Sequence, residues 1–67
     1  MSIKDLIKLK VALLNCLNKT VYATDFEVLD KHNLITIINE GGTVQILYPN
    51  NKDIKDILNK INKVLGE

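Results

Sequence analysis

Residues 34–48 read LITIINEGGTVQILY. Two runs rich in β-branched side chains, residues 34–39 and 43–48, stand on either side of Glu40-Gly41-Gly42. Two adjacent glycines can both adopt a positive φ, which a tight two-residue hairpin turn requires. The segment therefore predicts two antiparallel strands joined by a tight turn.

The segment before this hairpin, residues 21–29, is also rich in β-branched and aromatic side chains, and parts of it alternate between apolar and polar residues. Both features are typical of a strand. Residues 31–33, Lys-His-Asn, would form the turn to the next strand, and residues 23–25, where the alternation fails, would form a bulge or a bend. The centre of the chain thus predicts a three-stranded antiparallel meander.

A helix is predicted on each side of this meander. Residues 3–17 are apolar at helical spacing, with Ser2 as the N-cap and Asn18 as a residue that can end the helix in the left-handed conformation. Asn50-Asn51 offers caps for a second helix, whose apolar spacing continues to Leu65 before Gly66 stops it. The predicted fold is a single small α+β domain, residues 1–67, of order helix, three-stranded meander, helix (αβββα), in two layers.

Composition excludes several classes of protein. The chain has 67 residues, of which 46% are hydrophobic, and nine Lys and Arg against eight Asp and Glu leave a net charge of +1. Such a chain is too apolar to be disordered and too balanced to be a charged tail. A single cysteine excludes a disulfide scaffold and favours a reducing, cytoplasmic location, and no apolar run is long enough to span a membrane. The absence of arginine beside many Asn, Ile and Lys is typical of AT-rich genomes, such as those of archaea, low-GC bacteria and viruses.

The two predicted helices differ in how far their apolar side chains spread around the axis. In residues 51–65 they occupy one narrow face. In residues 3–17 they spread over a much wider arc, which Lys10 divides in two. We expect one side to pack on the protein's own sheet and the other on a second molecule. One side holds Leu6, Leu9, Leu13 and Leu17, the other holds Ile3, Ile7, Val11 and Leu14, and the spacing leaves open which of the two faces the second molecule.

The predicted sheet also carries more apolar side chains than one covered face needs. Its core-facing set would be Tyr22, Phe26, Val28, Ile35, Ile37, Val44, Ile46 and Tyr48. The other face should then be mostly polar, yet it keeps several large aliphatic residues. The sequence therefore predicts a homo-oligomer. The residues assigned to its interface are Ile3, Leu6, Ile7, Leu9, Val11, Leu13, Leu29, Leu34, Ile38 and Leu47.

Few residues could carry catalysis or bind a metal ion. Ser2 lies at the start of the chain, Cys16 in the first predicted helix and His32 in a turn, so their predicted positions do not converge on a hydrolytic triad. Asp25 and Glu27 would share one face of a strand, where a solvated surface is favoured over a weak hard-cation site. No enzymatic activity, cofactor or metal is predicted. An enzyme or small-ligand site would need a pocket shared between subunits.

The predicted order of elements is similar to that of double-stranded RNA-binding domains, which contact RNA through a lysine-rich second helix, the first helix and the loop between their first two strands. Here the second helix opens Asn51-Lys52-Asp53-Ile54-Lys55, the loop of residues 31–33 is short, and the chain has no arginine. The resemblance implies an alternative function in nucleic-acid binding. The lysines that would serve it are Lys4, Lys8, Lys52, Lys55, Lys60 and Lys63.

The function predicted first is a non-catalytic protein–protein interaction module. The surplus of apolar side chains indicates that the chain associates with itself, as a homodimer or a larger oligomer, and binds or regulates another protein. Nucleic acid is the alternative partner, and no membrane partner is expected.

Overall fold

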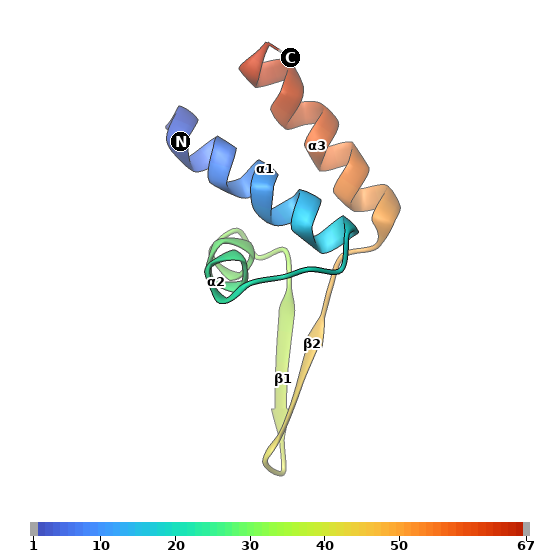
Figure 1. The fold of residues 1–67 in the computed structure, drawn as a ribbon. Coiled ribbons are helices and arrows are strands. Elements are labelled where there is room, and N and C mark those ends of the chain that lie inside the picture. Colours follow the sequence, from blue (N-terminus) through green and yellow to red (C-terminus); the bar gives the residue numbers. More distant parts are fainter. Residues whose placement is uncertain (1, 67) are drawn as a thin grey trace.

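Five elements follow one another along the chain: α1 (Ile3–Leu17), α2 (Ala23–Lys31), β1 (Thr36–Glu40), β2 (Thr43–Leu47) and α3 (Asn51–Leu65). The computed structural model describes residues 2–66. The helices pack together, and the two strands form a hairpin that extends away from them (Figure 1). The fold is a small α+β fold of order ααββα.

The predicted hairpin is confirmed. β1 and β2 pair in antiparallel fashion along their whole length, ending with Glu40 opposite Thr43. Gly41 and Gly42 make the turn between them with φ values of 56° and 82°. Side chains other than glycine rarely adopt this conformation, so the glycine pair fixes both the place of the turn and the register of the strands.

The prediction of a further strand at residues 21–29 is wrong. Residues 23–31 form α2, so the hairpin has two strands and the predicted order αβββα becomes ααββα. Residues 31–33, expected as a turn between strands, instead end this helix. Asn33 has a φ of 57°, and the backbone N–H of Leu34 donates to the carbonyl of Leu29 at 2.9 Å. This pattern is a Schellman motif, a common way for a helix to satisfy its last carbonyl groups.

Two local features explain why this segment is helical. The carboxylate of Asp25 accepts a hydrogen bond from the backbone N–H of Tyr22 at 3.0 Å, which satisfies one of the donors left open at a helix start. Phe26 and Leu29, three residues apart, both pack in the core. In a segment of nine residues the same apolar positions fit both a strand and a helix, and the capping residues decide between them.

The starts of the two predicted helices are confirmed, together with their caps. The Ser2 hydroxyl accepts a hydrogen bond from the backbone N–H of Asp5 at 3.2 Å. The side chain of Asn50 accepts one from the backbone N–H of Asp53 at 2.8 Å. Each cap satisfies an amide that the helix itself cannot.

The ends of these helices differ in one detail from the prediction. Gly66 ends α3 in the left-handed conformation, with a φ of 78°, as expected. Asn18, however, has a φ of −84°, and the left-handed residue at the end of α1 is Lys19, with a φ of 58°. The N–H of Thr20 then donates to the carbonyl of Asn15 at 2.9 Å, so α1 also ends in a Schellman motif.

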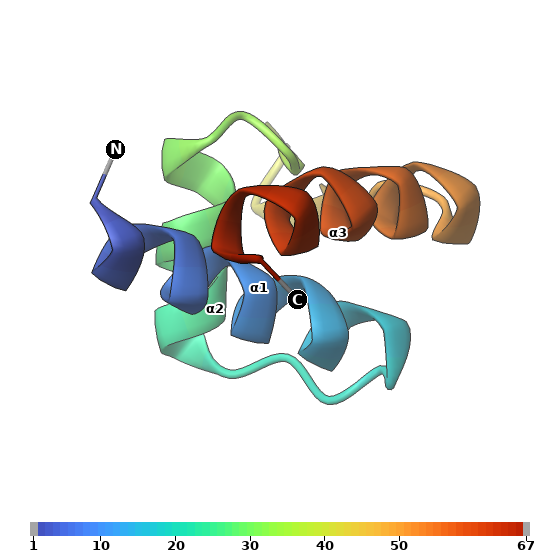
Figure 2. The same ribbon diagram turned by 90° about the horizontal axis from the view of Figure 1, so that it is seen from above.

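The core lies on both sides of α1, which contacts α2 and α3. Figure 2 shows α1 and α3 side by side, seen from above. Neither strand contributes a buried side chain within the part of the chain that the structure describes. The buried apolar residues are Leu9, Ala12, Leu13, Leu29, Ile35, Ile54, Leu58 and Ile61.

β1, β2 and their turn, residues 36–47, form a hairpin arm that accounts for the elongated shape of the molecule, 45 × 23 × 18 Å (Figure 1). Ile37 and Val44, predicted to face the core, are 52% and 59% exposed. Within the described residues, the arm is anchored at its base: Ile46 packs against the core, and the ring of Tyr48, which follows the arm, lies 6.2 Å from that of Phe26. The arm is therefore not a layer beneath the helices.

Candidate interaction surfaces

A stripe of exposed apolar side chains follows α1. Ile3, Ile7, Val11 and Leu14 are 67%, 48%, 47% and 40% exposed. Their spacing puts them on one side of the helix, opposite the residues that enter the core. These four residues, called the α1 stripe, form one of the two apolar sides that Lys10 divides in the sequence.

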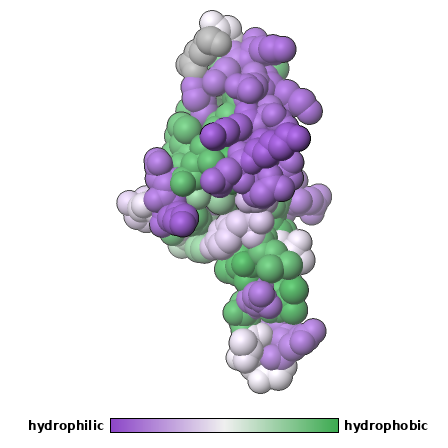
Figure 3. Space-filling view, turned by 90° about the vertical axis from the view of Figure 1, so that its right-hand side faces the viewer, coloured by the Kyte–Doolittle hydropathy of each residue, from purple (hydrophilic) through white to green (hydrophobic). Residues whose placement is uncertain are grey.

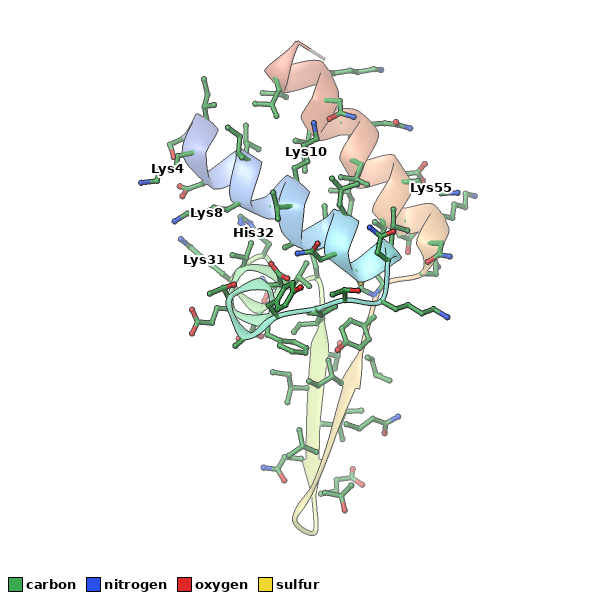
Figure 4. The ribbon with its side chains drawn as sticks, viewed as in Figure 1. Lys4, Lys8, Lys10, Lys31, His32 and Lys55 are labelled. Atoms are coloured by element: carbon green, nitrogen blue, oxygen red, sulfur yellow. The ribbon has the colours of Figure 1, made fainter. Side chains whose placement is uncertain are left out.

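Positive charge gathers beside the N-terminal half of α1. Lys4 and Lys8 extend from α1 toward the same side as Lys31 of α2, with His32 close to them (Figure 4). Hydrogen bonding with the Ser2 side chain, helped by the charges of Lys31 and Lys8, lowers the pKa of Asp5, so this carboxylate stays ionised among the lysines. A cavity of about 390 Å³ lies beside them, lined by two lysines and two carboxylates among its residues: Asp5, Lys8, Glu27, Val28, Lys31 and His32.

The hairpin arm carries the second exposed apolar surface. Ile37 and Val44 belong to one face of the arm, and Leu47, 45% exposed, belongs to the other. Figure 3 looks at the side of the molecule that shows the arm below the helices, and hydrophobic side chains cover much of the arm. Both faces of the arm therefore expose apolar side chains, whereas a face that stays in contact with water is normally polar.

The structure divides the ten predicted interface residues into three groups. Leu9, Leu13 and Leu29 are buried in the core of the single chain, so they form no part of its exposed surface. The half-buried group is Leu6, Leu34 and Ile38, and the exposed group is Ile3, Ile7, Val11 and Leu47.

Among the described residues, six exposed large apolar side chains lie outside the predicted interface: Leu14, Tyr22, Ile37, Val44, Tyr48 and Val64. The helical spacing of the α1 stripe is a signal that could have added Leu14. No such signal exists for Ile37 and Val44. In the predicted three-stranded sheet, both residues belong to the face that the helices cover.

The structure does not bring the six predicted nucleic-acid-binding lysines together. Lys4 and Lys8 extend from one side of the molecule, and Lys55 extends from α3 on the opposite side (Figure 4). Lys52, Lys60 and Lys63 are also exposed on α3. The sheet with its two strands departs from the topology of double-stranded RNA-binding domains that suggested these lysines.

Asp25 and Glu27 do not form the expected pair on one strand face. Asp25 is buried, and its carboxylate accepts hydrogen bonds from the side-chain amide of Asn15 at 2.9 Å and from the backbone N–H of Tyr22 at 3.0 Å. Glu27 is exposed on α2. Asp25 therefore ties α2 to α1, which is a structural role.

A cavity of about 490 Å³ lies between the end of α1, the base of the hairpin arm and the start of α3. Cys16 is on its wall, and burial raises the pKa of this thiol. A thiol with a raised pKa stays protonated at neutral pH and is a poor nucleophile. The lining is mainly apolar and comprises Cys16, Lys19, Val21, Phe26, Tyr48, Pro49, Asn51 and Ile54.

Other candidate groups are dispersed. His32 is half-buried at the end of α2. Lys10 is half-buried and extends from α1 toward α3 (Figure 4). Among residues 2–66, no three His, Cys, Asp or Glu side chains are grouped so that they could hold a metal ion. Within the same range, every helix is too short or too polar to cross a membrane.

No family model, curated protein or solved structure matches this chain.

Proposed function

We propose that this protein is a small, non-catalytic interaction module that associates with itself and binds a second protein. The observation that carries the proposal is the exposure of large apolar side chains on two separate surfaces, the α1 stripe and the hairpin arm. Contiguous apolar patches on soluble proteins mark interaction sites.

The size of the chain supports this proposal. A small chain buries a modest fraction of its surface, and its core stabilises it only marginally against the entropy of ordering. Association removes further apolar surface from water, which is worth about 25 cal/mol per Å². For a chain whose arm has no buried residue of its own, a partner is the main source of such burial.

The α1 stripe favours a second protein of particular chemistry. An exposed helix with apolar residues along one side can lie in a groove on another protein. Lys4 and Lys8 lie on the same helix as the stripe, and the net charge of α1 is positive. The complementary partner is an apolar groove edged by carboxylates, because opposite charges at the rim steer association and exclude wrong partners.

The oligomeric state tests the proposal. Light scattering coupled to size-exclusion chromatography, from about 1 µM to about 1 mM protein, should show a mass that rises from one chain to two or more. A single-chain mass over the whole range would contradict self-association.

A pair of matched variants tests the α1 stripe. Val11→Lys places a charge within the stripe, and Val64→Lys places the same charge at an exposed valine of α3. Binding is measured by far-western blotting or cross-linking to a purified protein whose apolar groove is edged by carboxylates. Val11→Lys should lower this binding, and Val64→Lys should not. Equal binding by both variants would remove the α1 stripe from the proposal.

A further inference from the structure

The outer edge of β2 is open along its length. In Figure 1, α2 lies on the β1 side of the hairpin, and no described element lies beside the far edge of β2. Because the two-residue turn closes at Glu40 and Thr43, hydrogen bonds to β1 come from alternate residues of β2, Thr43, Gln45 and Leu47. The backbone groups of Val44 and Ile46 then point outward, away from β1.

This edge lacks the features that protect exposed strands. Natural edges are blunted with charged side chains, proline or bulges. β2 reads TVQIL, so it has no charge and no proline, and its pairing with β1 runs without a bulge. β1, in contrast, ends in the charged residue Glu40. The β2 edge is the more receptive of the two to another strand.

We propose that β2 pairs in antiparallel fashion with β2 of a second copy of this chain, so that two hairpin arms form one four-stranded sheet. This inference rests on the self-association proposed above and names its surface. With the two-fold axis at Gln45, Val44 lies opposite Ile46 of the partner subunit, and Ile46 lies opposite Val44 of the partner subunit. Their outward N–H and C=O groups form the new hydrogen bonds, and the two Gln45 side chains meet at the axis.

Charge favours a second copy at this edge over one at the α1 stripe. β2 is uncharged, so pairing it with itself opposes no like charges. α1 carries Lys4, Lys8 and Lys10 against one acidic residue, Asp5, so two α1 helices would bring positive charges together.

Sheet size favours the same arrangement. A two-stranded hairpin alone is marginal in water, whereas three or more strands with an apolar face are stable. Pairing at β2 brings Val44 of each copy beside Ile46 of the other on one face of a four-stranded sheet, where cross-strand neighbours shield one another, whereas association of the α1 stripes would leave each arm a two-stranded hairpin.

Proline variants at the two edges test this inference. Val44→Pro removes an outward N–H from β2, and Asn39→Pro removes the equivalent outward N–H from β1, while neither breaks a bond between the strands. Val44→Pro should raise the dissociation constant of the dimer by about tenfold or more, and Asn39→Pro should leave it within about threefold. Backbone chemical shifts of the strands in both variants, recorded at concentrations where each is a single chain, verify that the hairpin is retained.

Hydrogen exchange of the wild-type chain provides a second measurement. The amides of Val44 and Ile46 should become protected as protein concentration rises, while those of Ile37 and Asn39 should not. If the wild type associates but neither the amides nor Val44→Pro respond, the inference is overturned and the proposed function stands on another surface. If the wild type stays a single chain at every concentration, both fall.

Discussion

The helical body, formed by α1, α2 and α3, and the hairpin arm are built from the same kinds of side chain but bury them differently. Leu13 and Leu29 in the helical body are fully buried, whereas Ile37 and Val44 in the arm are more than half exposed. In the helical body, α1 has neighbouring helices on two sides, whereas among the described residues the arm packs against the core at its base. Apolar content alone does not determine burial; the number of elements that meet at a place does.

One substitution made in both regions should give the largest difference. Leu13→Ala leaves a cavity in the core and should lower the free energy of unfolding by about 2–5 kcal/mol. Leu47→Ala, at a leucine 45% exposed on the arm, should cost less than about 1 kcal/mol in dilute, single-chain protein. Urea denaturation measures both, and equal losses would mean that the arm is as well packed as the helical body.

The hydrogen bonds of Asp25 provide the next largest effect. Asp25→Ala leaves the amide of Asn15 and the backbone N–H of Tyr22 without their buried acceptor, so it should cost about 1–3 kcal/mol of unfolding free energy. Asp25→Asn retains one acceptor oxygen and should cost less. Thermal denaturation followed by circular dichroism compares the two. If Asp25→Ala were neutral, the helical body would not depend on this link between α1 and α2.

Much of the fold could be predicted from the sequence because its signals are local. The apolar period, Ser2 and Asn50 define α1 and α3, and Gly41-Gly42 defines the hairpin. The sequence does not distinguish α2 from a strand, because its few apolar residues fit the spacing of a helix and that of a strand equally well. The residue that decides for the helix is Asp25, and it acts through a hydrogen bond that the spacing of residues does not reveal.

The candidate surfaces were predictable to different degrees for the same reason. The spacing along α1 identifies which of its side chains share a side, and the structure leaves Ile3, Ile7 and Val11 exposed there. Ile37 and Val44 are exposed because no described element covers their face of the arm. Spacing alone does not predict this exposure, since it depends on residues 23–31 forming a helix and not a strand.

A cap at the junction of the two regions should have a smaller effect. Asn50 follows the arm and caps α3, so Asn50→Ala should lower the free energy of unfolding by about 1 kcal/mol. Asn59→Ala, at an exposed position inside α3, should be neutral or slightly stabilising, because alanine favours the helix. Guanidinium denaturation of both variants isolates the cap. Similar values for the two would show that the Asn50 side chain is dispensable.

The smallest expected effect concerns the end of α1. Lys19 holds a left-handed φ of 58°, a conformation that glycine adopts without strain. Lys19→Gly should therefore raise the free energy of unfolding by a few tenths of a kcal/mol, whereas Lys60→Gly inside α3 should lower it by about 1 kcal/mol. Loss of stability in both variants would show that the lysine side chain matters more than its backbone conformation.

The contact between α1 and α3 has a consequence for how fast the protein folds. Residues 18–50 separate the two helices in the chain, whereas α2 follows α1 closely and the strands of the hairpin are neighbours. Local turns, helices and hairpins form within microseconds, but closing a long loop has an entropic cost that grows with its length. Docking of α3 on α1 should therefore be the slow step. Changes on the α3 side of that contact, such as at Leu58, should slow folding, and changes in the arm should mainly speed unfolding.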